Sequence, residues 1–138
     1  MRPPPEQRAS RVTTRTHRDL IVWRESMRLL TQVHRLAPEL PASELYGLSS
    51  QLRRAALSIP TNIAEGFGRR APRELRHALS IAEGSLRELQ TLLEATIMLG
   101  YFSKERLAAP IARANRVGYL IHRFAQTVRP RCVSPRPP

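Results

Sequence analysis

The chain has 138 residues, enough for one domain with its own hydrophobic core, so neither a second domain nor a stabilising disulfide or metal is expected. Its formal net charge is +12, and every basic residue except Lys104 is arginine. This balance favours polyanionic partners, nucleic acid before membrane. No apolar run approaches the 18 or so residues that a membrane-spanning helix needs.

The two ends of the chain are rich in proline and arginine and lack hydrophobic periodicity. Residues 1–18 carry a net charge of +4 and residues 129–138 a net charge of +3. We expect both to be disordered arms around a folded segment, residues 19–128. The first arm is arginine-rich, as mitochondrial transit peptides are, but its three consecutive prolines argue against an amphipathic helix, and it lacks the apolar stretch of a secretory signal. Because the single cysteine, Cys132, cannot form an internal disulfide, a cytoplasmic protein is expected.

The first helix is expected from Asp19 to Ala37. Its apolar residues recur at helical spacing and define one predicted buried face: Leu20, Trp23, Met27, Leu30 and Ala37. Asp19 suits the N-terminal end of a helix, and Pro38 cannot continue one. The connection PELPASELYG follows, with two prolines and a glycine.

The second helix is expected to begin near residues 46–48 and to end near Phe67, where two glycines, Gly66 and Gly68, favour termination. Its predicted core stripe is Leu48, Leu52, Ala55, Ile59 and Ile63. Pro60 lies inside this segment, where a proline removes a backbone hydrogen bond and clashes with the preceding turn. We therefore expect a kinked helix, or two short helices that meet at residues 58–60.

The third helix shows the most regular pattern. Steps of four and three residues alternate along its predicted core stripe: Leu75, Leu79, Ala82, Leu86, Leu89, Leu93 and Thr96. Pro72 suits the first turn and Gly100 closes the helix, which gives about 42 Å of helix at about 1.5 Å per residue.

The fourth helix is expected from Ser103, a suitable N-cap, to Val128, with Glu105 in its first turn. Its predicted core stripe is Leu107, Ile111, Ala114, Val117, Ile121, Phe124 and Val128. Pro110 falls early, and we expect it to separate a short first turn from the main helix. Four such helices with short connections predict an all-α fold, an antiparallel up-down-up-down four-helix bundle.

No enzyme signature stands out. Histidine occurs at four positions, none of which has a carboxylate four residues away as a metal-binding pair on a helix would: His17, His34, His77 and His122. The run GFGRR lacks the ending and the preceding strand of a phosphate-binding loop. We expect neither catalysis nor a metal or other cofactor.

A polar ribbon accompanies the core stripe of the second helix. Its members follow one another at helical spacing: Arg54, Ser58, Asn62, Glu65 and Arg69. Polar groups near a core need partners. The favoured interpretation is structural, with Ser58 and Asn62 satisfying backbone groups that Pro60 frees and with Glu65 paired to an arginine. A ligand or acid–base site and an oligomer contact are the alternatives.

The third helix contains a glycine, Gly84, in its interior, where glycine costs about 1 kcal/mol relative to alanine. Small residues lie beside it: Ser80, Ala82 and Ser85. We expect another helix to approach here, from the same chain or from another subunit. Glu83 is expected to pair with Arg87 one turn later.

Positive charge is concentrated in residues 53–76, where six arginines face two acids, Glu65 and Glu74. The six are Arg53, Arg54, Arg69, Arg70, Arg73 and Arg76. The planar guanidinium group suits phosphate oxygens, so binding would be salt-sensitive and weakly sequence-specific; a solvated surface is the alternative. Phe67 and Tyr46 are the aromatic residues nearby, which gives base stacking little support.

Three segments together resemble a known family: DLIVWRESMRLL (19–30), ELYGLSSQLRRAALSIPTNIAEGFGR (44–69) and IAEGSLRELQTLLEATIMLGYF (81–102). They are similar to bacterial four-helix-bundle proteins encoded in 23S ribosomal RNA intervening sequences, a family that is itself similar to the accessory variability protein of diversity-generating retroelements. The run SIPTNIAEG is the most specific part, and GSLREL adds to it. The resemblance covers about residues 19–125.

The resemblance implies a bundle that assembles into a ring-like homopentamer with a basic surface, and the retroelement protein binds nucleic acid and a reverse transcriptase. From the resemblance we expect the basic surface to include Arg53, Arg54, Arg69 and Arg70. Three further arginines are assigned to it only because they lie nearby: Arg73, Arg76 and Arg87. We expect a non-enzymatic accessory protein that binds RNA or DNA. The alternative is a scaffold that docks an acidic protein such as a polymerase or reverse transcriptase.

Overall fold

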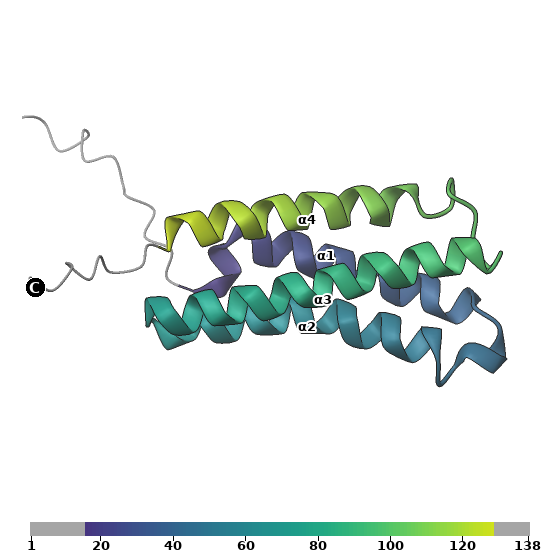
Figure 1. Ribbon diagram of the computed structural model, residues 1–138, viewed down its shortest axis with the longest axis horizontal. Coiled ribbons are helices and arrows are strands. Elements are labelled where there is room, and N and C mark those ends of the chain that lie inside the picture. Colours follow the sequence, from purple (N-terminus) through teal and green to yellow (C-terminus); the bar gives the residue numbers. More distant parts are fainter. Residues whose placement is uncertain (1–15, 129–138) are drawn as a thin grey trace, which may run out of the picture.

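The computed structural model describes residues 16–128, which form four α-helices and no strand (Figure 1). The elements in chain order are η2 (His17–Asp19), α1 (Ile21–Leu36), η3 (Ala37–Glu39), η4 (Ala42–Glu44), α2 (Leu48–Arg69), α3 (Pro72–Met98) and α4 (Ala108–Thr127). Most of the two predicted arms lies outside the described residues. Residues 17 and 18, predicted to belong to the first arm, form part of a 3-10 turn instead, and the His17 ring meets that of Trp23 edge-on at 4.9 Å.

Each helix contacts two others along a common long axis (Figure 1). The interface between α2 and α3 is the most extensive, and α1 also contacts α2 and α4, while α4 also contacts α3. Within the described residues α1 and α3 do not touch, and neither do α2 and α4, so these pairs lie diagonally. The enclosed core is aliphatic, and its largest fully buried side chains are Leu29, Leu52, Ile59, Ile63, Leu79, Leu86, Leu89, Leu93, Leu107, Ile121, Val33 and Val117.

The buried face of α1 is not the predicted one. Trp23, Met27 and Leu30 are only partly buried. The buried positions follow steps of four and three that start one residue earlier: Val22, Ser26, Leu29, Val33 and Leu36. Serine interrupts this pattern in the sequence, but the Ser26 hydroxyl donates to the carbonyl of Trp23 at 2.7 Å, which satisfies it inside the helix.

Helix α2 is continuous through Pro60, so the predicted alternative of two short helices is wrong. Pro60 is buried in the helix, and the next residue, Thr61, donates its hydroxyl to the carbonyl of Leu57 at 2.7 Å. The helix also runs two residues beyond the predicted end, to Arg69. It ends where Arg70 adopts a left-handed conformation with φ 59°, a common way for a helix to stop.

The other two helices follow the predictions more closely. Helix α3 begins at Pro72 as predicted, and the left-handed Gly100 (φ 77°) follows its end. Helix α4 begins at Ala108, five residues after the predicted start. The Ser103 hydroxyl accepts a hydrogen bond from the backbone N–H of Arg106 at 3.1 Å, so a separate turn precedes the helix, as the position of Pro110 predicts. The predicted stripes of α3 and α4 are buried or partly buried in the core.

Candidate nucleic-acid interface

Four of the seven arginines predicted to bind nucleic acid flank the two-residue turn between α2 and α3. Arg69 lies in the last turn of α2, Arg70 follows it, and Arg73 and Arg76 lie in the first two turns of α3. Arg76 is half-buried and the other three are exposed. Because the turn is short, the fold brings these four guanidinium groups to one end of the molecule.

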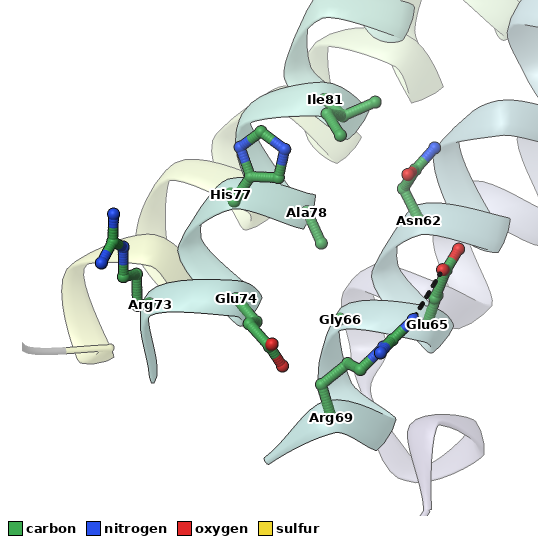
Figure 2. Close-up of a pocket in the computed structure, with 9 residues that line it drawn as sticks. All are labelled: Asn62, Glu65, Gly66, Arg69, Arg73, Glu74, His77, Ala78 and Ile81. Atoms are coloured by element: carbon green, nitrogen blue, oxygen red, sulfur yellow. Dashed lines mark ion pairs between the residues drawn. The ribbon is translucent and has the colours of Figure 1, made fainter. Parts of the chain in front are cut away.

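A groove of about 630 Å³ runs between α2 and α3 beside this turn. Its lining is Asn62, Glu65, Gly66 and Arg69 from α2, and Arg73, Glu74, His77, Ala78 and Ile81 from α3 (Figure 2). Arg69 lies along Glu65, with a nitrogen–oxygen distance of 3.7 Å, while the Arg73 side chain extends away from α2 (Figure 2). The lining has two glutamates and two arginines, whose formal charges cancel. Arg70 and Arg76, which do not line the groove, lie beside the same turn.

The remaining three arginines are separated from the turn. Arg53 is half-buried and faces α1, where it lines a second groove with Leu30 and Leu57. Arg54 is exposed on α2, near the middle of the α2–α3 interface. Arg87 lies on the exposed side of α3, 3.8 Å from Glu83 as predicted. The seven residues therefore do not form one continuous surface.

The polar ribbon of α2 connects this helix to α3. The Ser58 and Ser85 hydroxyl groups are 2.7 Å apart, and the Asn62 amide donates to the Ser58 carbonyl at 2.8 Å and to the Ser58 hydroxyl at 3.0 Å. Pro60 leaves the carbonyl of Ala56 without its helical hydrogen-bond donor, and we expected Ser58 and Asn62 to satisfy such a group. Their hydrogen bonds go to Ser58 and Ser85 instead, and the Ser58–Ser85 bond joins the two helices.

Of the two glycines considered, Gly66 is the one that allows α2 and α3 to approach closely. A Cβ atom placed on Gly66 would lie 2.4 Å from that of Ala78, far below a van der Waals contact. A Cβ atom on Gly84 would meet no side chain or neighbouring helix within 4 Å in the described chain. The expected approach to Gly84 by a helix of the same chain is therefore wrong, and an approach by another subunit stays a prediction.

The two ends of the molecule differ in charge. The α2–α3 turn, the start of α1 and the end of α4 share one end (Figure 1). The six arginines of segments 16–23, 62–79 and 121–128 define what we call the basic end: Arg18, Arg69, Arg70, Arg73, Arg76 and Arg123. The same segments contain three acids, Asp19, Glu65 and Glu74, which leaves a net charge of +3. The opposite end, formed by residues 37–47 and 99–107, has three glutamates against Lys104 and Arg106, a net charge of −1.

A buried carboxylate between α1 and α4 was not anticipated from the sequence. Glu25 is 5% exposed, and its carboxylate binds Arg28 of α1 at 2.9 Å, Arg113 of α4, and more distantly Arg116 at 3.6 Å. Arg113 also donates to the side-chain oxygen of Gln32 at 3.1 Å. One signal was present in the sequence: this glutamate is the single acid in α1, and α4 has none.

Other kinds of site find little support in the described part of the chain. Residues 16–128 contain no group of three histidine, cysteine or acidic side chains that could hold a metal ion. Over the same range no helix is long and apolar enough to cross a membrane. Tyr46 is 93% exposed, but it precedes α2, at the opposite end from the α2–α3 turn, and Phe67 is half-buried.

Comparison with known proteins places the chain in a family. The crystal structure of a protein of unknown function from the S23 ribosomal protein family of Bacteroides thetaiotaomicron has the same fold, with a TM-score of 0.70 and 21% identity over 77% of this chain and 99% of that one. No curated protein matches the chain significantly. The profile of the 23S rRNA-intervening sequence proteins matches residues 18–123. This match covers most of the described helices, and the chain therefore belongs to the 23S rRNA-intervening sequence protein family.

Proposed function

We propose that the protein is a non-enzymatic, cytoplasmic accessory protein that binds nucleic acid, RNA or DNA, through its basic end. The observation that carries this proposal is the difference in charge between the two ends of the molecule, +3 against −1. Outside the described residues, the sequence contains a further seven arginines and one glutamate. A concentration of arginine of this kind attracts polyanions and pairs well with phosphate oxygens.

The arrangement of helices supports an antiparallel up-down-up-down bundle. Contacts pair late residues of one helix with early residues of the next: Ala37, directly after α1, with Ser49, Gly66 with Ala78, and Gln90 with Asn115. We further propose that the bundle forms a ring-like homo-oligomer, a pentamer as the family resemblance implies.

Salt titration of nucleic-acid binding tests the proposed surface. In a variant with Arg69, Arg70, Arg73 and Arg76 all replaced by Gln, the slope of log affinity against log salt should fall by up to about 3.6, since each lost phosphate contact removes about 0.9 for a duplex. Replacing Lys104 and Arg106 by Gln at the opposite end is the control and should leave the slope nearly unchanged. Fluorescence anisotropy with a labelled RNA measures both.

Two results would count against this proposal in different ways. An unchanged slope in the four-arginine variant would show that the basic end is not the binding surface. If the native protein bound neither RNA nor DNA in a salt-dependent manner, the proposed function would be wrong.

A second candidate function, a scaffold for an acidic protein such as a polymerase or reverse transcriptase, rests on the groove between α1 and α2. This groove of about 470 Å³ has an apolar lining from Leu30 and Leu57 beside His34, Arg35 and Arg53. The Nε atom of Arg53 is buried there without a hydrogen-bond partner. A carboxylate on an apolar peptide segment would satisfy it. A protein partner that stays bound to the purified protein after nuclease treatment would support the scaffold over nucleic-acid binding.

A further inference from the structure

The positive charge of the four helices is divided unequally between two pairs. Helices α1 and α4 together have six arginines and one acid, Glu25, a net charge of +5. Helices α2 and α3 also have six arginines, but their five glutamates reduce the net charge to +1. The glutamates are Glu65, Glu74, Glu83, Glu88 and Glu94. The excess positive charge of residues 53–76 is therefore largely offset by the three glutamates in the rest of α3.

The one acid of the α1–α4 pair adds no negative charge to the surface. Glu25 is buried between the two helices, and its carboxylate is neutralised by Arg28, Arg113 and Arg116. The charged side chains that these helices present to solvent are therefore arginines, five of them exposed and Arg113 half-buried. We call these six residues the α1–α4 strip: Arg24, Arg28, Arg35, Arg113, Arg116 and Arg123.

The spacing of the strip follows the two helix axes. Arg24, Arg28 and Arg35 are four and seven residues apart, so they project from nearly the same side of α1, and Arg116 and Arg123 of α4 are seven apart. From Arg24 to Arg35 the strip extends about 16 Å at about 1.5 Å per residue. A nucleic-acid duplex advances about 3.4 Å per base pair, so this length matches about five base pairs of phosphate backbone.

Few other side chains on these helices suit a different partner. Tyr119 is the exposed aromatic residue of α4, and the guanidinium carbon of Arg123 lies 6.0 Å from the centre of its ring. Stacking of several unpaired bases needs a series of free aromatic rings, which the strip does not offer. Protein partners are usually held by buried aromatic or apolar anchors, whereas the strip is a repeat of one charge.

We propose that the α1–α4 strip binds the phosphate backbone of double-stranded nucleic acid that extends from the basic end along the molecule. This inference rests on the proposed function and adds to it a second surface, on helices to which the resemblance assigned no binding residue. Duplexes should bind more tightly than single strands of the same sequence, because the two helices present charge along a path and no stacking platform.

Two variants of equal charge test this surface. The first replaces Arg35 and Arg116, two residues of the strip that lie outside the basic end, by Gln, and its matched control replaces Lys104 and Arg106 by Gln. All four side chains are exposed, and each variant loses two positive charges. The probe is a labelled RNA duplex of about 20 base pairs, together with one of its strands alone. The salt slope should fall by about 1.8 in the strip variant, with about a ten-fold loss of affinity at low salt, and by less than about 0.5 in the control.

The outcomes separate this inference from the proposed function. Equal losses in the two variants would show that only net charge matters and would overturn the strip, as would tighter binding of the single strand. If the strip variant binds like the native protein while the four-arginine variant of the basic end does not, the function stands and the strip is excluded. Failure of the native protein to bind any nucleic acid would overturn both. Unchanged circular dichroism and melting establish that the variants fold.

Discussion

The α2–α3 and α1–α4 interfaces lie in the same small bundle but use different chemistry. Between α2 and α3 the residues are small: Gly66 faces Ala78, and Ser58 and Ser85 share a hydrogen bond. Between α1 and α4 the contact is made by long side chains, with the Glu25 carboxylate reached by arginines from both helices. The first interface includes a close approach of two backbones, and the second includes a buried ionic contact between long side chains.

This difference shows how the described part of the chain can be basic while Glu25 is its one buried charged side chain. Small residues where α2 and α3 meet leave no room for arginine there, so the charged groups of these helices lie along the edges of the interface, as Arg54 and Glu65 do. Between α1 and α4 one buried acid compensates for arginines that would otherwise repel one another. The cost of burying Glu25 is offset by its hydrogen bonds, and the exposed ends of the same arginines remain on the surface.

Substitution of Gly66 by Ala should have the largest effect, because it breaks the close approach of α2 and α3. The added methyl group would meet the Cβ atom of Ala78, which has no alternative rotamer. Overpacking of this kind costs about 1–3 kcal/mol or more, so we expect a loss of about 2 kcal/mol in the free energy of unfolding. Urea denaturation followed by circular dichroism measures it.

Gly84→Ala is the matched control on α3. No other helix or side chain of the described chain lies within 4 Å of the new methyl group, so the change should stabilise the protein by about 1 kcal/mol through helix propensity. Loss of stability here, together with dissociation of an oligomer in light scattering, would instead show that another subunit approaches Gly84.

Glu25→Gln tests the ionic contact between α1 and α4. The side chain keeps its size but loses its charge, which leaves Arg113 partly buried without a counter-ion. Removing one partner of a fully buried pair costs about 3–5 kcal/mol, and we expect about 1.5 kcal/mol here because the arginines are partly solvated. Glu83→Gln, which removes an exposed pair with Arg87, should change stability by less than about 0.5 kcal/mol. Equal effects of the two substitutions would contradict the assigned role of Glu25.

A double-mutant cycle on Ser58 and Ser85 sharpens the picture of the α2–α3 interface. Each substitution by Ala should cost about 1 kcal/mol, because a half-buried hydroxyl loses its partner. The double variant should lose about 0.5 kcal/mol less than the two single losses together, since the second substitution removes a bond that the first already broke. Strict additivity in urea denaturation would show that the two hydroxyl groups do not interact.

The smallest effect is expected at the end remote from the basic end, where Tyr101 donates its hydroxyl to Glu44 at 3.1 Å. This hydrogen bond, then burial and the glutamate charge, raise the pKa of Tyr101 above the ordinary 10.0. A raised folded-state pKa means that the contribution to stability is present below pH 10 and is lost as pH rises through the folded value. In a near-ultraviolet absorbance titration, Glu44→Gln should make Tyr101 ionise at lower pH, and Tyr101→Phe should remove the transition assigned to Tyr101.

Most of the fold could be predicted because helical periodicity is a local property. The seams of α3 and α4 follow from regular spacing of aliphatic residues, and Pro72 and Gly100 mark the ends of α3. The face of α1 was mispredicted because Ser26 interrupts its pattern, and the sequence does not reveal that its hydroxyl is satisfied by a carbonyl of the same helix. The continuity of α2 through Pro60 likewise depends on packing around the proline.

The candidate site could be predicted only in part, since charge is easily counted along a chain but surfaces form across it. Arg69, Arg70, Arg73 and Arg76 were expected together because a short turn keeps sequence neighbours close. Arg53 was assigned to the same surface, yet the rotation of α2 points it toward α1. Glu25 was missed because its partner Arg113 is 88 residues away.

The two-residue connection between α2 and α3 has a consequence for how the chain folds. Closing this hairpin costs less loop entropy than closing the longer connections 37–47 and 99–107, and the resulting interface is the largest in the molecule. We therefore expect α2 and α3 to associate first in the folding transition state, with α1 and α4 docking later. In stopped-flow kinetics Ser58→Ala should mainly slow folding, whereas Glu25→Gln should mainly accelerate unfolding. The sequence would thus form the helix pair with a net charge of +1 before it assembles the pair that carries most of the net charge of residues 16–128.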